Sequence, residues 1–457
     1  MDKVVLAYSG GLDTSVAIKW IQEKYNLDVV AVTLDVGNES DFQAIQEKAL
    51  RTGAIKAYVQ DAKEDFVRYF VFPSLQAGAI YEERYPLATA LARPLIAKVL
   101  VDYAYREGAA AIAHGCTGKG NDQVRFDVTI SALAPELQII APVREWGMSR
   151  EEEILYAQRH DIPVPVTLAS PYSVDQNLWG RSVEAGVLED PWAEPPENAF
   201  AWTMNPRYAP DEASYVEVAF KHGIPIGLDG ELLDGQTLIA RLNDVAGSHG
   251  VGRIDHIENR LVGIKSREVY ECPAAVVLHT AHAELEKMTL TKDQMRFKQL
   301  VSREVADLIY NGLWFSALHQ DLAAYVASSQ RFVSGTVRVR LFKGACMAVG
   351  RQAEQSLYDP ALATYGEGDL FDHKAAVGFI QLHGLPLRNQ VRAQLLPGHS
   401  PDELLRLVAP ESSREPRVTS RESRVPEPRP TALDSARIQA PSEPSHEPRT
   451  DSPTVNS

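Results

Sequence analysis

The segment KVVLAYSGGLDTS, residues 3–15, joins a short hydrophobic run to a turn rich in glycine and hydroxyl side chains. Residues 3–8 have the β-branched, apolar character of a buried parallel strand. From Asp13 onward, apolar side chains recur near helical spacing, at positions 16, 20, 21 and 25. The segment therefore predicts a strand that turns sharply into a helix.

The turn has the chemistry of an anion site. A helix that starts directly after a strand leaves its first backbone N–H groups unpaired, next to the positive end of the helix dipole. Gly10 and Gly11 let the main chain approach a bulky ligand, because neither carries a Cβ atom. Ser9, Thr14 and Ser15 can add hydroxyl donors. The predicted ligand is a phosphate or a pyrophosphate.

The common phosphate motifs do not fit this turn. A Walker A loop needs a lysine that is missing here, and the dinucleotide fingerprint G-x-G-x-x-G is absent. An ordinary tight turn would explain the two glycines but not the S-G-G-x-D-[ST]-S pattern after the first strand. The pattern resembles the pyrophosphate loop of the N-type ATP pyrophosphatases. That resemblance implies cleavage of ATP between its α and β phosphates and transfer of AMP to a carbonyl oxygen.

The chain beyond the turn continues to alternate between strands and helices. This alternation predicts βαβ units and a parallel sheet covered on both faces. Gly53 is expected in the C′ position of a helix, Pro94 to kink or break one, and Ser149 with Glu152 to form a capping box. The expected strands are 28–36, 54–60, 109–115 and 136–143, and the expected helices are 41–53, 87–108 and 149–161. A first domain is predicted for residues 1–165.

The second half of the chain has a different pattern. A Pro-rich stretch at 189–200 precedes alternating stretches at 215–223 and 335–344, and residues 280–314 are largely helical. This is typical of an α+β domain, predicted for residues 166–370. Residues 371–397 are expected to form a C-terminal helix. Residues 398–457 are expected to form a tail that is disordered from about 411, since Pro, Ser, Arg and Glu dominate there.

Composition excludes several classes of protein. The net charge of −15 argues against non-specific nucleic-acid binding, which needs basic surface. The three cysteines are not paired as C-x-x-C, so a disulfide framework or a structural zinc site is not expected. No apolar run reaches 18 residues, so no membrane span is expected, and the N-terminus is unlike a signal peptide. A cytoplasmic protein is predicted.

A second polar cluster follows another predicted strand end. Residues 113–127, AHGCTGKGNDQVRFD, bring together glycines, hydroxyls, acids and bases. A solvated charged loop is the alternative reading. However, the carboxyl ends of the strands in an open α/β sheet form one ligand crevice. The two clusters are therefore expected to lie on the same rim.

Several segments taken in chain order resemble the argininosuccinate synthase family, over residues 1 to about 390. The segments are AYSGGLDTS, ARPLIAK, HGCTGKGNDQVRF, VLEDPWAEPP, GVGRIDHIENRLVGIKSREVYE and SLYDPALATY. The resemblance implies an ATP-dependent ligase of arginine biosynthesis that joins citrulline and aspartate through a citrullyl-adenylate, with AMP and pyrophosphate as products. It implies an adenine nucleotide alpha-hydrolase-like domain, a synthetase and multimerisation domain, and a homotetramer. ATP with Mg²⁺ is implied as substrate, without an organic prosthetic group.

The resemblance also implies site residues. For ATP they are Ala7, Tyr8, Ser9, Gly10, Gly11, Leu12, Asp13, Thr14, Ser15, Leu34 and Gly115; for aspartate Thr117, Asn121 and Asp122; for citrulline Tyr85, Asn121, Arg125, Ser173, Ser182, Glu258 and Tyr270. Arg125 suits a carboxylate, while Asp122 and Glu258 suit ammonium groups. Taken alone, Tyr85 and Tyr270 are typical of packing residues and Glu258 of a solvated helix acid.

One segment departs from the commoner family pattern. In YPLATALARP, residues 85–94, Ala88 stands where a glycine and Ala90 where a serine is implied. The serine would contact the citrulline carboxylate, so its absence removes one donor, a net effect of about 0.5–1.5 kcal/mol. No side-chain nucleophile, general base or protein metal ligand is identified, and positioning is expected to supply the catalysis.

Two other functions remain open on the sequence. A tRNA sulfur- or amine-transferase would share the pyrophosphate loop, although basic surface or catalytic cysteines would be expected. A non-catalytic nucleotide-binding or assembly protein would be consistent with the changes at Ala88 and Ala90. The resemblance favours the ligase, with small-molecule substrates and neither nucleic acid nor membrane as partner.

Overall fold

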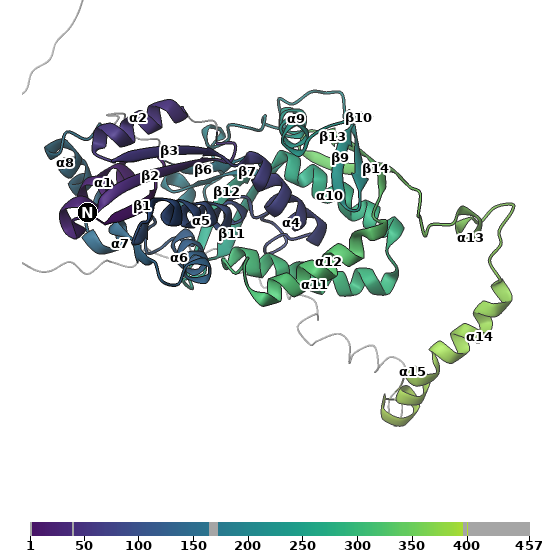
Figure 1. The fold of residues 1–457 in the computed structure, drawn as a ribbon. Helices are drawn as coiled ribbons and strands as arrows, with labels where there is room; N and C mark the ends of the chain where they lie inside the picture. Colours follow the sequence, from purple (N-terminus) through teal and green to yellow (C-terminus); the bar gives the residue numbers. More distant parts are fainter. Residues whose placement is uncertain (1, 39–40, 164–171, 396–399, 401–457) are drawn as a thin grey trace, which may run out of the picture. The chain divides into compact units, whose positions relative to one another are not determined.

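The computed structural model describes residues 2–38, 41–163, 172–395 and 400 (Figure 1). The predicted tail beyond 400 lies outside these residues, so its predicted disorder stays a prediction. The chain divides into two compact units, Met1–Asp369 and Leu370–Ser457. All the elements of both predicted domains that are described below belong to the first unit.

The first part of the chain forms a five-stranded parallel sheet in the order β3-β2-β1-β4-β5. Its strands are β1 (Lys3–Ala7), β2 (Asp28–Asp35), β3 (Lys56–Asp61), β4 (Ala111–Ala113) and β5 (Gln138–Ile140). Its helices are α1 (Leu12–Tyr25), α2 (Phe42–Thr52), α3 (Lys63–Phe66), η1 (Val67–Val71), α4 (Phe72–Ala77), α5 (Ala88–Glu107), α6 (Asp122–Leu133), α7 (Pro142–Trp146) and α8 (Arg150–Arg159). The predicted parallel α/β architecture is confirmed.

The central strands β1, β2 and β4 are buried on both faces of the sheet, as their apolar residues predict. Val4 and Leu6 of β1 pack in a cluster with apolar residues of α1 and α2. Val5, between them, packs in a different cluster with residues of α5 and α6. This alternation follows from the two-residue period of side chains along a strand. Helices therefore cover each face, and the ends of the strands remain open for a ligand.

The second part of the chain adds two antiparallel sheets, in the orders β10-β9-β8-β13-β14 and β11-β12-β7-β6. The strands are β6 (Ser173–Asn177), β7 (Gly180–Glu184), β8 (Ser214–Lys221), β9 (Ile224–Leu228), β10 (Glu231–Leu232), β11 (Arg253–Asn259), β12 (Lys265–Glu271), β13 (Gly335–Phe342) and β14 (Ala345–Ala353). The helices are η2 (Gly186–Glu189), η3 (Glu197–Ala199), α9 (Gly235–Ser248), α10 (Pro273–Thr289), α11 (Lys292–Tyr310), α12 (Ala317–Ser329), η4 (Gln330–Phe332) and α13 (Pro360–Ala363). This matches the predicted α+β pattern.

Local signals in the sequence correspond closely to element ends. Gly53 ends α2 with a φ of 116°, in the left-handed region that glycine favours. Ser149 and Glu152 form the predicted capping box at the start of α8. Pro94 does not break α5, which runs from Ala88 to Glu107 with the proline inside it. The helical stretch 280–314 is two helices, because α10 ends before Leu290 and α11 begins after the cap Thr291.

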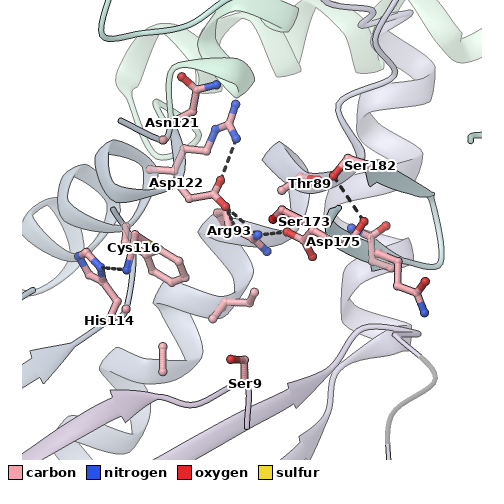
Figure 2. Close-up of a pocket in the computed structure, with 18 of the residues that line it drawn as sticks. Ser9, Thr89, Arg93, His114, Cys116, Asn121, Asp122, Ser173, Asp175 and Ser182 are labelled. Carbon is pink, nitrogen blue, oxygen red and sulfur yellow. Dashed lines mark hydrogen bonds and ion pairs between the residues drawn. The ribbon is translucent and has the colours of Figure 1, made fainter. Parts of the chain in front are cut away.

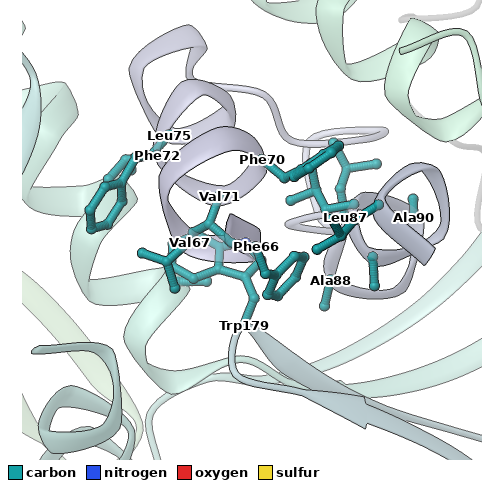
Figure 3. Close-up of a cluster of buried hydrophobic side chains, with 14 of the residues drawn as sticks. Phe66, Val67, Phe70, Val71, Phe72, Leu75, Leu87, Ala88, Ala90 and Trp179 are labelled. Atoms are coloured by element: carbon teal, nitrogen blue, oxygen red, sulfur yellow. The ribbon is translucent and has the colours of Figure 1, made fainter. Parts of the chain in front are cut away.

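A hydrophobic cluster joins the first part of the chain to the second (Figure 3). Trp179, at the turn between β6 and β7, is fully buried and packs in one cluster with Phe66, Val67 and Leu87. Its indole Nε1 donates to the Pro86 carbonyl at 2.9 Å. The β6–β7 hairpin is thereby fixed against the residues that start α5. This contact positions the second sheet beside the rim of the first.

The second unit contains α14 (His373–His383), α15 (Leu385–Gln390) and η5 (Val391–Leu395). Its apolar side chains are exposed, including Phe379 and Leu382 at 66% and 73%. The predicted C-terminal helix at 371–397 is therefore present as shorter helical segments. No helix within the described part of the chain is long and apolar enough to cross a membrane.

Candidate active site

A cavity of about 520 Å³ lies at the rim of the parallel sheet. β1 and β4 are neighbours in the sheet but not in the sequence, so the strand order reverses beside β1. Ligands bind at such switch points in open α/β sheets. The two predicted clusters follow β1 and β4, and residues of both line this cavity. Their expected convergence is therefore confirmed.

The first loop has the backbone of an anion cradle. Gly10 has a φ of 78°. Gly11 is the N-cap residue of α1 and has no side chain to accept a capping hydrogen bond. Thr14 and Ser9 share a hydrogen bond of 3.2 Å between their hydroxyls and both line the cavity. The two loops also touch, because a Cβ added to Gly115 would lie 3.0 Å from the Thr14 methyl. The glycine at 115 is what allows them to approach.

Lysine reaches this loop from another element. Nζ of Lys48, on α2, donates to the Gly10 carbonyl at 2.7 Å. Burial, reinforced by the charge of Arg51, lowers the pKa of Lys48. The sequence does not predict this contact, because it depends on how α2 packs against the loop.

Most of the predicted site residues line the cavity. They are Ala7, Tyr8, Ser9, Thr14, Leu34, Tyr85, Gly115, Thr117, Asn121, Asp122, Arg125, Ser173, Ser182, Glu258 and Tyr270. The residues Gly10, Gly11, Leu12, Asp13 and Ser15 are not among its lining. Ser15 is fully buried, and its hydroxyl donates to the Gly11 carbonyl at 2.7 Å and contacts the Tyr8 hydroxyl at 3.0 Å. Asp13 instead pairs with Arg150 of α8 at 2.7 Å.

Asp122 lies between Arg125 and Arg93, and its contact with Arg93 is shown in Figure 2. Nε of Arg93 donates to one of its oxygens and Nη1 of Arg125 to the other, both at 2.9 Å. Burial alone would raise the pKa of Asp122, but the two guanidinium groups outweigh it and hold the pKa below its usual value. Arg93 also pairs with Asp175 of β6. The network therefore links α5, α6 and β6 across the cavity.

Arg125 has a donor to spare. Its side chain is almost fully buried, with Nε bound to the Tyr310 carbonyl at 2.9 Å and Nη1 to Asp122. Within the described part of the chain, its buried Nη2 has no hydrogen-bond partner. A buried donor left unpaired is costly, so this group is suited to an anionic ligand in the cavity.

Glu258 is held by phenol groups. It lies on β11 and is 1% exposed, so the alternative reading as a solvated helix acid is wrong. Tyr310 donates to one carboxylate oxygen at 2.6 Å and Tyr270 to the other at 2.5 Å. Burial and the nearby acids raise the pKa of both tyrosines. Asn121 donates to the Tyr310 hydroxyl at 2.8 Å and approaches Glu258 at 3.4 Å.

A second acidic group lies beside Glu258. Glu268 of β12 accepts from Arg260 at 3.0 Å, and Arg260 also pairs with Glu184. Burial, together with the charges of Glu258 and Glu184, raises the pKa of Glu268 to about 8. All four residues line the cavity. Several carboxyl groups therefore gather at this end of the cavity, and an ammonium group bound there would favour their ionised forms.

Sequence reasoning assigned no role to Arg93, Asp175, Arg260 or Glu268. No local signal in the sequence marks them, and the burial pattern of β11 is equally unexpected, because His256 and Glu258 are buried while Asp255 and Ile257 are exposed. This inverts the usual alternation, in which the apolar residues of a strand face inward. A buried charged residue on a strand is an informative observation, because charged residues are almost never fully buried unless they are paired.

Ala88 and Ala90 lie in the hydrophobic cluster and not in the lining of the cavity. A Cβ added to Gly180 of β7 would lie 3.1 Å from the Cβ of Ala88, so the alanine at 88 is accommodated by the glycine opposite. Thr89, between the two alanines, does line the cavity. The serine contact that the resemblance implies has no counterpart at Ala90.

The described residues contain no group of three or more His, Cys, Asp or Glu side chains placed to hold a metal ion. The three cysteines are free.

Two family models match the chain in succession. The model of the arginosuccinate synthase N-terminal HUP domain covers residues 3–163, and that of the arginosuccinate synthase C-terminal domain covers residues 172–390. The argininosuccinate synthase of Dehalococcoides mccartyi is 61% identical over 393 residues, which are 86% of this chain and 97% of that protein. That of Symbiobacterium thermophilum is 62% identical over 387 residues, 84% of this chain and 96% of that protein. That of Oceanobacillus iheyensis is 58% identical over 385 residues, 84% and 92% of the two chains.

Proposed function

Since the chain belongs to the argininosuccinate synthase family, we propose that the cavity at the sheet rim binds ATP, citrulline and aspartate together. The protein condenses citrulline and aspartate with ATP to give argininosuccinate, AMP and pyrophosphate, a ligase reaction of arginine biosynthesis. The observation that carries the proposal is that a single cavity is lined by the first loop, the second cluster and the buried Glu258 group.

ATP is placed at the first loop. Its phosphates would be held by the hydroxyls of Ser9 and Thr14 and by the unpaired N–H groups at the start of α1. The other predicted residues of the loop do not line the cavity and would set the conformation of the loop; they are Gly10, Gly11, Leu12, Asp13 and Ser15. Leu34 at the end of β2 and Gly115 would contact the nucleoside. Mg²⁺ is proposed to enter with ATP, where it would offset charge on the departing pyrophosphate.

Citrulline is placed between Arg125 and Glu258. The free Nη2 of Arg125 would bind the citrulline carboxylate, because a guanidinium matches the planar geometry of a carboxylate. Glu258, already fixed by Tyr270 and Tyr310, would accept from the ammonium group. Tyr85, Asn121, Ser173 and Ser182 would complete this part of the lining.

Aspartate is placed at the second cluster, beside Thr117, Asn121 and Asp122. Asp122 stays ionised between Arg93 and Arg125, so it can accept from the ammonium group of the incoming aspartate. A ureido carbon is a poor electrophile, and transfer of AMP to its oxygen creates a good leaving group. The aspartate ammonium loses a proton to solvent, the free amine attacks that carbon to form the C–N bond, and AMP departs with the electrons of the broken C–O bond. The side chains of this cavity would act by positioning the three substrates, which can supply about 7–11 kcal/mol in favourable cases.

The proposal also covers how the subunits assemble, where the two domains meet in the sequence and in which compartment the protein works. The exposed apolar side chains of α14 support a homotetramer, in which another subunit would cover them. The two family models support a boundary near residue 165 between a nucleotide-binding and a synthetase domain. The free cysteines favour a reducing, cytoplasmic setting.

A screen of amino acids for AMP release tests the function directly. Purified full-length protein with Mg-ATP is expected to release AMP and pyrophosphate only when citrulline is present. Argininosuccinate is expected only when aspartate is added as well. Formation of ADP, or of no product with both amino acids, would contradict the proposed function.

A further inference from the structure

The turn YEERY, residues 81–85, has an unusual backbone. Glu82 and Glu83 have φ values of 49° and 62°, so two successive residues with side chains lie in the left-handed region. Tyr81 and Tyr85 close the turn by exchanging backbone hydrogen bonds of 2.8 and 2.9 Å. Such turns are dominated by glycine, asparagine and aspartate, and strained residues persist only where surrounding contacts hold them.

The two glutamates differ in what holds them. The Glu82 carboxylate accepts from the side-chain amide of Asn259 at 2.5 Å and from its backbone N–H at 3.3 Å. Nε2 of His256 lies 3.1 Å from the same carboxylate. Among the residues that the structure describes, Glu83 pairs only with Arg303, and both of these side chains are at least 70% exposed. Glu82 therefore fixes the turn to β11 at positions on either side of Glu258.

The same turn supports the tyrosines that bind Glu258. The ring of Tyr81 stacks on Tyr310, with centroids 3.6 Å apart and planes within 5°. The ring of Tyr85 stacks on Tyr270, with centroids 4.2 Å apart and planes within 13°. Tyr310 and Tyr270 each donate to one oxygen of Glu258. Both phenols that orient the buried carboxylate are thus backed by rings from one strained turn.

We propose that Glu82 is a positioning residue for the citrulline end of the cavity. Its hydrogen bonds with Asn259 hold the turn in the conformation that places Tyr81 and Tyr85 behind the two phenols. Loss of the Glu82 carboxylate would let the turn relax toward ordinary backbone angles and would tilt the phenols away from Glu258. The inference rests on the proposed placement of citrulline beside Glu258.

The test compares Glu82→Ala and Glu82→Gln with Glu83→Ala as the matched control, all in the full-length chain. Glu82→Ala is expected to raise the KM for citrulline about tenfold, while the KM for ATP stays within about twofold of wild type. Glu82→Gln is expected to fall between, because an amide oxygen still accepts from Asn259. Glu83 has a positive φ like Glu82, but its described ion pair is with Arg303 of α11 and not with β11. The KM values of Glu83→Ala for citrulline and ATP are therefore expected to match those of wild type.

The melting temperature of each variant separates positioning from stability. A Glu82→Ala variant that melts earlier but keeps the wild-type KM for citrulline would overturn the proposal. Equal effects of Glu82→Ala and Glu83→Ala, or equal rises in the KM values for citrulline and ATP, would overturn it too. Failure of the proposed function would appear separately, as wild-type protein that releases no AMP with citrulline.

Discussion

At the scale of single residues, the cavity is lined by buried acidic side chains that are paired with arginines. Asp122 is flanked by Arg93 and Arg125, and Glu268 by Arg260. Each arrangement leaves one charged group with unused hydrogen-bonding capacity, and Nη2 of Arg125 is the clearest case. A substrate that carries both a carboxylate and an ammonium group completes such an arrangement, as an amino acid does.

Gly10 gives the first prediction at this scale. Gly10→Val forces a β-branched residue to a φ of 78° and places its Cβ 3.0 Å from Ile45. We expect pyrophosphate release to be abolished and the free energy of unfolding to fall by about 1–3 kcal/mol. Pyrophosphate release and urea denaturation measure the two effects.

Gly147→Val is the control for that experiment. Gly147 has a similar φ of 62°, but a Cβ there would meet nothing within 4 Å. The control is expected to lose stability while retaining pyrophosphate release. Undiminished release by the Gly10→Val variant would mean that the loop does not hold the phosphates.

Glu153 gives a prediction about pH. Burial, together with the nearby Asp13, raises the pKa of Glu153 to about 7, although Arg150 opposes the shift. Because the folded pKa lies above the unfolded value, the protonated carboxyl stabilises the fold at low pH. That contribution is lost as the pH rises through about 7. The urea midpoint of wild type, relative to Glu153→Gln, is therefore expected to fall between pH 5 and 8.

Glu151→Gln is the matched control, because Glu151 is exposed on the same helix. Its urea midpoint is expected to run parallel to that of wild type across the same pH range. A constant difference between wild type and Glu153→Gln from pH 5 to 8 would contradict the assigned titration.

At the scale of elements, the site depends on how the β6–β7 hairpin meets the start of α5. Asn177 donates to the Ala88 carbonyl at 2.8 Å, and Trp179 to the Pro86 carbonyl. The hairpin approaches closely because residue 180 is glycine. A Cβ there would lie 2.5 Å from Sγ of Cys272 and 3.1 Å from the Cβ of Ala88. The alanine at 88 and the glycine at 180 are thus packed against each other.

Gly180→Ala is therefore expected to destabilise the fold by about 1–3 kcal/mol through overpacking. Most of the cost is expected to come from Cys272, whose sulfur is the nearest atom. In a Cys272→Ala background the penalty should shrink, because the added methyl then has space. Guanidinium denaturation of the four proteins of this double-mutant cycle measures the coupling, and additive penalties would contradict the packing described.

The elements that could be predicted from sequence are those specified by local signals. β1, α1, the glycine end of α2 and the cap of α8 follow from hydrophobic period and from residues within one turn. The antiparallel pairing that places Tyr270 opposite Ser182 depends on non-local register and has no such signal. For the same reason the contacts of Lys48 and Arg93 were not predicted. Glu258 could be assigned only through the family resemblance, since one acid in a sequence does not reveal its burial.

At the scale of the whole molecule, the cavity and the family models both end before the C-terminal tail predicted for residues 398–457. The cavity-lining residues end at Tyr270 and the second model ends at residue 390. We expect a chain that ends at residue 397 to keep kcat and all three KM values within about twofold of wild type. Steady-state kinetics of the two chains test this. A lower kcat at equal protein concentration would show that the tail contributes to catalysis.

The order in which the cavity is completed has a consequence for a chain still being synthesised. The phosphate loop and the second cluster lie within the first 133 residues, whereas Glu258, Tyr270 and Tyr310 come from β11, β12 and α11. During synthesis, the first loop and the second cluster therefore leave the ribosome before the carboxylate of β11 and the phenols of β12 and α11.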